Sequence, residues 1–117
     1  MTDLVDFALT THVEDDGSTL IALAGELDLH RVRALADALQ ALAGGVVVDL
    51  QEVTFLDSAT LALLVHEHRR LQAAGQELTV LVGEQTPTAV FAITGIDRIL
   101  TIRSAEAPSR VADSRAG

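Results

Sequence analysis

The pattern of hydrophobic and polar positions predicts that the chain opens with a β-hairpin. Over residues 5–13, apolar side chains occupy every second position except Thr11, which is typical of a strand with one solvent-facing side. Residues 14–18 are acidic or small and include Gly17, so they predict a turn. The largely apolar residues 19–27 then predict the returning strand of the hairpin.

Two later segments follow the period of an amphipathic helix. In the first, the apolar residues 32, 35, 36, 39, 42 and 43 share one face, and Gly44-Gly45 ends the helix. In the second, residues 61, 64, 65, 68 and 71 form the apolar stripe, whereas His66, Glu67 and Arg70 lie outside it. Between the helices, residues 46–50 form a short β-branched run, which is typical of a strand buried on both faces.

The C-terminal part predicts one more strand–helix–strand unit. Residues 77–82 are strand-like, Pro87 suits a helix start, Gly95 ends that short helix, and residues 98–102 predict a last strand at the edge. We therefore expect one α/β domain over residues 1–104, with a mixed β-sheet, an opening hairpin, βαβ crossovers and helices packed on the sheet. Residues 105–117 predict a marginal helix or a frayed tail. The expected core includes Leu35, Leu39, Val47, Leu61, Leu64, Val65 and Val80.

Charge and composition exclude several classes of function. The 117 residues contain 8 Lys and Arg against 17 Asp and Glu, and the net charge of −9 opposes binding to nucleic acid. With only three aromatic residues, a stacking platform for bases is also missing. The absence of cysteine excludes disulfides and thiolate sites. The acidic N-terminus and short apolar runs predict neither a signal peptide nor membrane insertion, so we expect a cytoplasmic protein.

No constellation in the sequence predicts catalysis or metal binding. His66 and His68 follow Ser58 by eight and ten residues on one predicted helix, which places them roughly 12–15 Å away at ~1.5 Å per residue. The two histidines point about 200° apart, so they cannot share a metal ion. The G-x-S-x-G motif of a nucleophile elbow is absent. We expect no enzymatic activity, no metal and no cofactor.

The pair Asp57-Ser58 precedes the second helix. Both residue types are good helix N-caps, because a short side-chain oxygen accepts hydrogen bonds from the first-turn N–H groups. Taken alone, the pair is explained by capping, and the sequence leaves open which of the two residues is the cap.

Three blocks give the pair a wider context: Gly25-Glu26-Leu27-Asp28, Val48-Asp49-Leu50 and Phe55-Leu56-Asp57-Ser58. In their order and spacing they resemble the STAS domain family, in particular the bacterial anti-sigma factor antagonists. The resemblance implies that Ser58 is phosphorylated by an anti-sigma factor that is also a serine kinase. It also implies that the unphosphorylated protein binds this kinase, that the sigma factor is thereby released to regulate transcription, and that a serine phosphatase reverses the modification. The implied partner-binding residues are Asp28, Asp57, Ser58, Ala59 and Thr60.

The sequence departs from the family pattern D-S-[ST]-G-L-G at both glycines, where Thr60 and Ala62 stand. Residues 61–66 are also similar to the small STAS subunits of bacterial lipid-transport complexes. The alternative function is therefore a fixed STAS subunit of a lipid-transport or larger signalling assembly.

Overall fold

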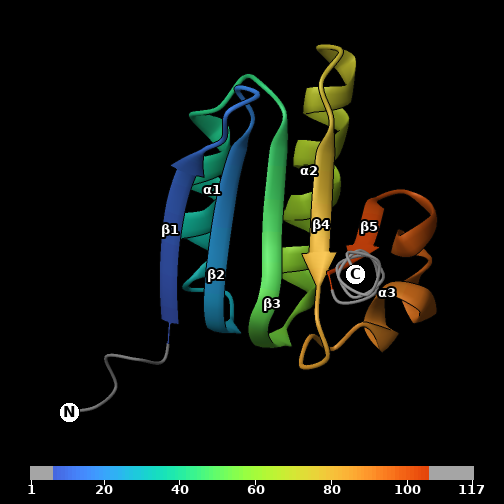
Figure 1. Ribbon diagram of the computed structural model, residues 1–117. Helices are drawn as coiled ribbons and strands as arrows, with labels where there is room; N and C mark the ends of the chain where they lie inside the picture. Colours follow the sequence, from blue (N-terminus) through green and yellow to red (C-terminus); the bar gives the residue numbers. More distant parts are fainter. Residues whose placement is uncertain (1–6, 106–117) are drawn as a thin grey trace, which may run out of the picture.

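The computed structural model describes residues 7–105 and shows one α/β domain (Figure 1). Most of the predicted segment 105–117, and residues 1–6 of the predicted domain, lie outside this description. The elements, in chain order, are β1 (Phe7–Val13), β2 (Thr19–Leu27), α1 (Val32–Gln40), β3 (Val46–Leu56), α2 (Ser58–Ala73), β4 (Leu78–Val82), α3 (Ala89–Thr94), the 3-10 helix η2 (Ile96–Arg98) and β5 (Thr101–Ser104).

The five strands lie in one sheet in the order of the sequence, β1-β2-β3-β4-β5. Strand β1 is antiparallel to β2, and the other neighbouring strands are parallel. The acidic turn between β1 and β2 contains Gly17 with a φ of 91°, a backbone conformation that glycine adopts without steric cost. The predicted hairpin, the mixed sheet and the parallel crossover from β3 through α2 to β4 are confirmed.

Helices α1 and α2 lie on the same face of the sheet (Figure 1). Burial alternates along β3, where Val46, Val48 and Leu50 are buried and the intervening Val47 and Asp49 are partly exposed. The prediction that this strand is buried on both faces is therefore wrong. A run of valines does not distinguish a strand covered on both faces from one covered on a single face.

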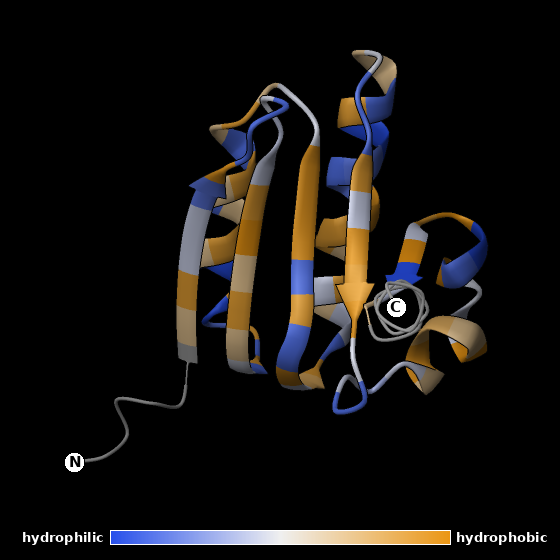
Figure 2. Cartoon of the chain, viewed as in Figure 1, coloured by the Kyte–Doolittle hydropathy of each residue, from blue (hydrophilic) through white to orange (hydrophobic). Residues whose placement is uncertain are grey.

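The core fills the space between the sheet and the helices α1 and α2. Figure 2 shows that hydrophobic residues recur along the strands of the sheet. Of the expected core residues, Val47 is only partly buried and lies outside the core, which corrects one assignment, whereas Val65 is partly buried but packs against the core. Val47 points to the face that carries neither α1 nor α2, and Val65 lies at the margin of the buried side of α2. Five assignments are confirmed: Leu35, Leu39, Leu61, Leu64 and Val80.

Two further corrections concern the last strand and the second helix. The chain forms η2 after Gly95, whose φ of 79° ends α3, so the last strand starts at Thr101 rather than at residue 98. Glu67 is fully buried, although the helical stripe places it outside. Its Oε1 accepts a hydrogen bond from Nε of Arg70 at 2.7 Å, and Nη2 of Arg70 donates to the Leu39 and Leu42 carbonyls at 3.0 and 3.1 Å. Arg70 thus pairs with Glu67 within α2 and joins α2 to the end of α1 through these carbonyls.

Candidate functional site

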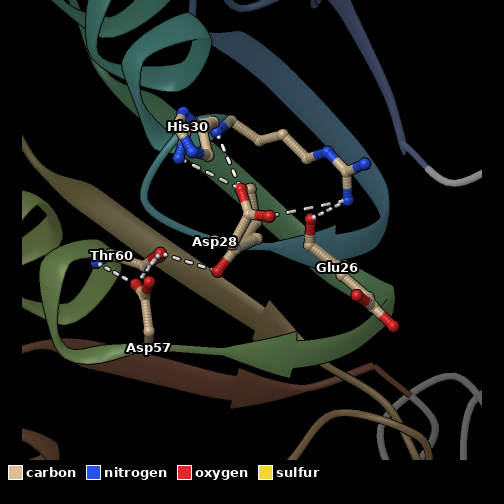
Figure 3. Close-up of polar contacts among 7 residues, drawn as sticks. Glu26, Asp28, His30, Asp57 and Thr60 are labelled. Carbon is tan, nitrogen blue, oxygen red and sulfur yellow. Dashed lines mark hydrogen bonds and ion pairs between the residues drawn. The ribbon is translucent and has the colours of Figure 1, made fainter.

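Two turns meet at the end of the sheet where the parallel strands terminate. Strands β2 and β3 are neighbours, and Leu27 pairs with Leu56 in the last position of their register. The residues that follow, Asp28 after β2 and Asp57 after β3, therefore lie at the same edge (Figure 3). The two aspartates that the sequence motif singles out are brought together by parallel pairing.

Asp57 is the N-cap of α2. Its backbone is extended, and Oδ1 accepts hydrogen bonds from the Thr60 backbone N–H and the Thr60 hydroxyl, each at 3.1 Å. An aspartate cap satisfies an N–H of the first turn that has no partner inside the helix. The question that the sequence leaves open is answered: the cap is Asp57 rather than Ser58.

Ser58 is the first residue of α2, and its side chain is exposed. Its hydroxyl makes no hydrogen bond with the part of the chain that the structure describes. Because Asp57 is the cap, the Ser58 hydroxyl has no structural task at the helix terminus. It is accessible to solvent beside N–H groups whose dipoles favour an anion.

Thr60 connects the two turns instead of facing solvent. The residue is fully buried, and its hydroxyl lies 3.4 Å from the Leu27 carbonyl as well as 3.1 Å from Asp57 (Figure 3). Because it is buried, the Thr60 side chain supports the site from within, and the partner contact that the resemblance implies for Thr60 stays a prediction. Ala59, by contrast, is partly exposed next to Ser58.

Asp28 organises the turn between β2 and α1. Its Oδ1 accepts from the backbone N–H groups of Arg31 at 3.0 Å and His30 at 3.1 Å, and Oδ2 lies 3.9 Å from Nη1 of Arg31. The hydrogen bond from the Arg31 backbone is the largest cause that lowers the pKa of Asp28 below its ordinary value of 3.8. Desolvation acts in the opposite direction, and the charge of Arg31 lowers the pKa further. Nη1 of Arg31 also lies 3.4 Å from the Glu26 carbonyl. Asp28 is thus a fixed anion at the site.

Two exposed apolar side chains flank the aspartates, and sequence reasoning did not identify them. Phe55 at the end of β3 is 46% exposed and pairs in register with Glu26, and Leu29, directly after Asp28, is 65% exposed. A shallow groove between α1 and α2 is lined by Leu29 together with Leu63. The available signal was that Leu29 directly follows Asp28 and that Phe55 precedes Asp57 by two residues. A single exposed apolar residue is common, so only the grouping of both residues around the motif aspartates suggests a contact site.

Among residues 7–105, no group of three or more histidine, aspartate or glutamate side chains is placed to hold a metal ion. His66 is exposed and His68 is buried, which agrees with their predicted divergence along α2. None of the helices described here is long and apolar enough to cross a membrane.

Comparison with known proteins assigns the fold to a family. A family model described as "Mlab, STAS domain" matches residues 10–102. The anti-sigma-B factor antagonist of Listeria monocytogenes is 30% identical over 90 residues, which cover 74% of this chain and 79% of that protein. The homologue named in the same way from Listeria innocua matches to the same extent. The chain belongs to the STAS domain family.

Solved structures agree with this assignment. The crystal structure of an anti-sigma factor antagonist from Mycobacterium paratuberculosis superposes with a TM-score of 0.70 at 28% identity, over 82% of this chain and 86% of that one. The unphosphorylated form of the anti-sigma factor antagonist SpoIIAA has a TM-score of 0.68 at 22% identity, over 94% and 98% of the two chains. The SpoIIAA likeness supports the fold alone.

Proposed function

We propose that this domain is an anti-sigma factor antagonist. In this proposal its unphosphorylated form binds an anti-sigma factor that is also a serine kinase, phosphorylation of Ser58 ends the binding, and a serine phosphatase restores it. The names of the Listeria relatives and of the mycobacterial structure support the class. The observation that carries the proposal is the placement of Ser58, which is exposed at the start of α2 while Asp57 alone caps the helix.

The charges at the site explain how a phosphate would act. A phosphoserine adds about −1.5 to −2 charges at pH 7. At the first turn of α2 this charge meets favourable N–H dipoles, which stabilise an anion by roughly 0.3–1 kcal/mol. The surface beside it already carries Asp57 and Asp28. A partner surface that fits these carboxylates therefore meets excess negative charge and added volume, while the fold is retained.

The contact surface in this proposal consists of two kinds of side chain. Ser58, Ala59 and the carboxylates of Asp28 and Asp57 form its polar centre. Phe55 and Leu29 supply exposed apolar area close to the motif aspartates in the sequence, in keeping with aromatic and aliphatic anchors that are surrounded by polar contacts at protein interfaces. The domain acts by binding, and none of its steps in this proposal is catalytic.

The test is a phosphorylation and binding experiment with candidate anti-sigma factors, beginning with any kinase encoded beside the gene. The purified protein and its Ser58→Ala variant are incubated with the kinase and ATP, and the phosphorylated residue is mapped by mass spectrometry. We expect modification at Ser58, none in the Ser58→Ala variant, and reversal by a serine phosphatase. Phosphate on Thr54, Thr60 or Ser104 in the wild-type protein would contradict the assignment.

The alternative function is that of a fixed STAS subunit in a lipid-transport or larger signalling assembly. The observation in its favour is the replacement of both motif glycines by Thr60 and Ala62. A fixed subunit co-purifies with a permease or scaffold protein and stays bound after incubation with kinase and ATP. A switched antagonist is released from its partner under the same conditions.

A further inference from the structure

The face of the sheet that carries neither α1 nor α2 has an apolar cluster far from Ser58. The cluster consists of Leu20, Val47 and Leu81, one residue from each of β2, β3 and β4. Leu20 pairs directly with Val47, and Leu81 pairs with Asp49, two residues further along β3. About 30 Å of strand separates Val47 from Leu56 at ~3.3 Å per residue, so the cluster and the Ser58 site lie at opposite ends of the sheet.

The cluster forms the floor of two adjoining hollows. The smaller hollow, of about 580 Å³, contains all three apolar side chains, and the larger, of about 740 Å³, contains Val47 and Leu81. Sheets with one solvent-facing side normally place polar residues there. Apart from Phe55 at the other end of the sheet, many other positions on this face are small or polar, as at Ala22, Ala24 and Thr79. Three partly exposed aliphatic side chains gathered in one hollow are the exception to that pattern.

The rim of the hollows is acidic. Glu14, Asp15 and Asp16 border the smaller hollow from the β1–β2 turn, and Glu77 borders the larger one. Among the residues that line the two hollows, Arg103 supplies the one permanent positive charge. Four carboxylates against one guanidinium around an apolar floor define what the surface can accept: an aliphatic group that enters the floor and cations that lie beside the rim.

We propose that this surface, the acidic hollow, docks a segment of a partner protein in which an aliphatic side chain is flanked by lysine or arginine. The proposal is independent of the function proposed for Ser58. Because the two sites lie at opposite ends of the sheet, phosphorylation of Ser58 leaves the acidic hollow available. One domain can then hold one partner while it exchanges another.

The test uses two synthetic peptides of equal charge, Lys-Leu-Lys-Leu-Lys and Lys-Ser-Lys-Ser-Lys, with the full-length protein. Each peptide carries a fluorophore for anisotropy, and ¹⁵N-labelled protein reports the site by amide shifts. We expect the leucine peptide to bind at least about tenfold more tightly than the serine peptide. We expect the shifted amides to lie at residues 14–20, Val47 and Leu81.

Charge-reversal variants give the matched control. Asp15 at the rim and Asp37 on α1 are both exposed aspartates, so Asp15→Lys and Asp37→Lys change the net charge equally. We expect Asp15→Lys to lower the affinity for the leucine peptide by about threefold or more relative to Asp37→Lys, which is the effect of losing an exposed ion pair. Val47→Thr keeps the shape of the side chain but makes the floor polar, and it should also weaken binding.

Four results would overturn the proposal. The first is equal affinity for the two peptides, and the second is equal weakening by Asp15→Lys and Asp37→Lys. The third is a set of shifts confined to the Ser58 end of the sheet. The fourth is occupation of the hollow without peptide: shifts at Val47 that depend on protein concentration identify a second copy, and nuclear Overhauser contacts from Leu81 to residues 106–117 identify the chain's own C-terminal segment.

Discussion

The Thr60 hydroxyl lies 3.1 Å from Oδ1 of Asp57 and 3.4 Å from the carbonyl of Leu27, so the cap of α2 is tied to the end of β2. The two turns of the site are thereby held together by a residue that solvent does not reach. In this chain a threonine occupies a position where the family pattern has glycine, and its hydroxyl gives it a structural role.

This arrangement predicts that Thr60→Val destabilises the protein by about 1–3 kcal/mol, because the Leu27 carbonyl loses a hydroxyl partner while the side-chain shape is kept. Thr60→Ser, which keeps the hydroxyl, is the control and should retain the hydrogen bonds at a smaller cost. Urea unfolding followed by far-UV circular dichroism measures both free energies. A Thr60→Val variant as stable as the wild-type protein would show that the hydroxyl contributes nothing.

The identity of the cap predicts different outcomes at adjacent positions. Asp57→Ala removes the acceptor for the Thr60 N–H and should cost about 0.5–2 kcal/mol of folding free energy. Ser58→Ala removes a hydroxyl without a hydrogen-bond partner in the described part of the chain, so its effect should be close to zero. Thermal melts of the two variants compare them directly. A larger loss for Ser58→Ala than for Asp57→Ala would contradict the capping geometry.

The ion pair between the partly exposed Arg70 and the buried Glu67 on α2, together with the hydrogen bonds from Arg70 to the end of α1, predicts a large effect of Arg70→Met. Without Arg70, Glu67 is left buried without its cation, and the carbonyls of Leu39 and Leu42 lose a donor, so we expect a loss of about 3 kcal/mol. The neighbouring Arg69 is exposed and serves as the matched control, with Arg69→Met expected to change stability by less than about 0.5 kcal/mol. Equal effects of the two variants in urea unfolding would exclude a stabilising role for the pair.

The core assignment predicts that Leu64→Ala costs about 2–5 kcal/mol, since the side chain is fully buried between α2 and the sheet. Ile93 on α3 is 82% exposed, so Ile93→Ala should be almost neutral. Chemical denaturation measures both values. A loss below about half a kcal/mol for Leu64→Ala would place this residue at the surface.

The lowered pKa of Asp28 predicts a pH dependence with a definite sign. The Asp28 carboxylate stays ionised to a lower pH in the folded protein than in the unfolded chain, where its pKa is near 3.8. Asp28 therefore contributes stability above that pH, and the contribution disappears as the pH falls through the lower, folded-state pKa. Asp28→Asn should be less stable than wild type at neutral pH, and the difference should shrink in acid. If the stability difference between the wild-type protein and Asp28→Asn grew as the pH fell, the lowered pKa of Asp28 would be contradicted.

The elements and much of the core follow from periodicity, whereas burial at particular positions depends on tertiary contacts. Leu35 and Leu39 could be assigned because they recur at helical spacing on a helix with one buried face. Glu67 could not, because α2 packs against both the sheet and α1, and its buried arc is wider than the apolar stripe. Val47 was misassigned because the sequence does not show how many faces of a sheet are covered.

The site was predictable to a similar degree. The motif spacing identifies Asp28, Asp57 and Ser58, because aspartates that follow adjacent parallel strands meet at one edge. The choice of Asp57 as cap and the burial of Thr60 could not be predicted from the local sequence. Both depend on the Leu27 carbonyl, which lies beside Thr60 only in the folded structure. Phe55 was overlooked because a single apolar residue inside a motif looks like part of the strand.

The central claim is that a phosphate on Ser58 ends partner binding without unfolding the domain. The direct measurement is a calorimetric titration of the anti-sigma factor with four forms: the unphosphorylated protein, the authentic phosphoprotein, Ser58→Ala and Ser58→Asp. Circular dichroism melts of each form accompany it. The account predicts tight binding by the unphosphorylated protein and Ser58→Ala, weakened binding by Ser58→Asp, none by the phosphoprotein, and a folded domain throughout. A phosphoprotein that binds as tightly as the unphosphorylated form, or one that loses binding because it has unfolded, would contradict the account.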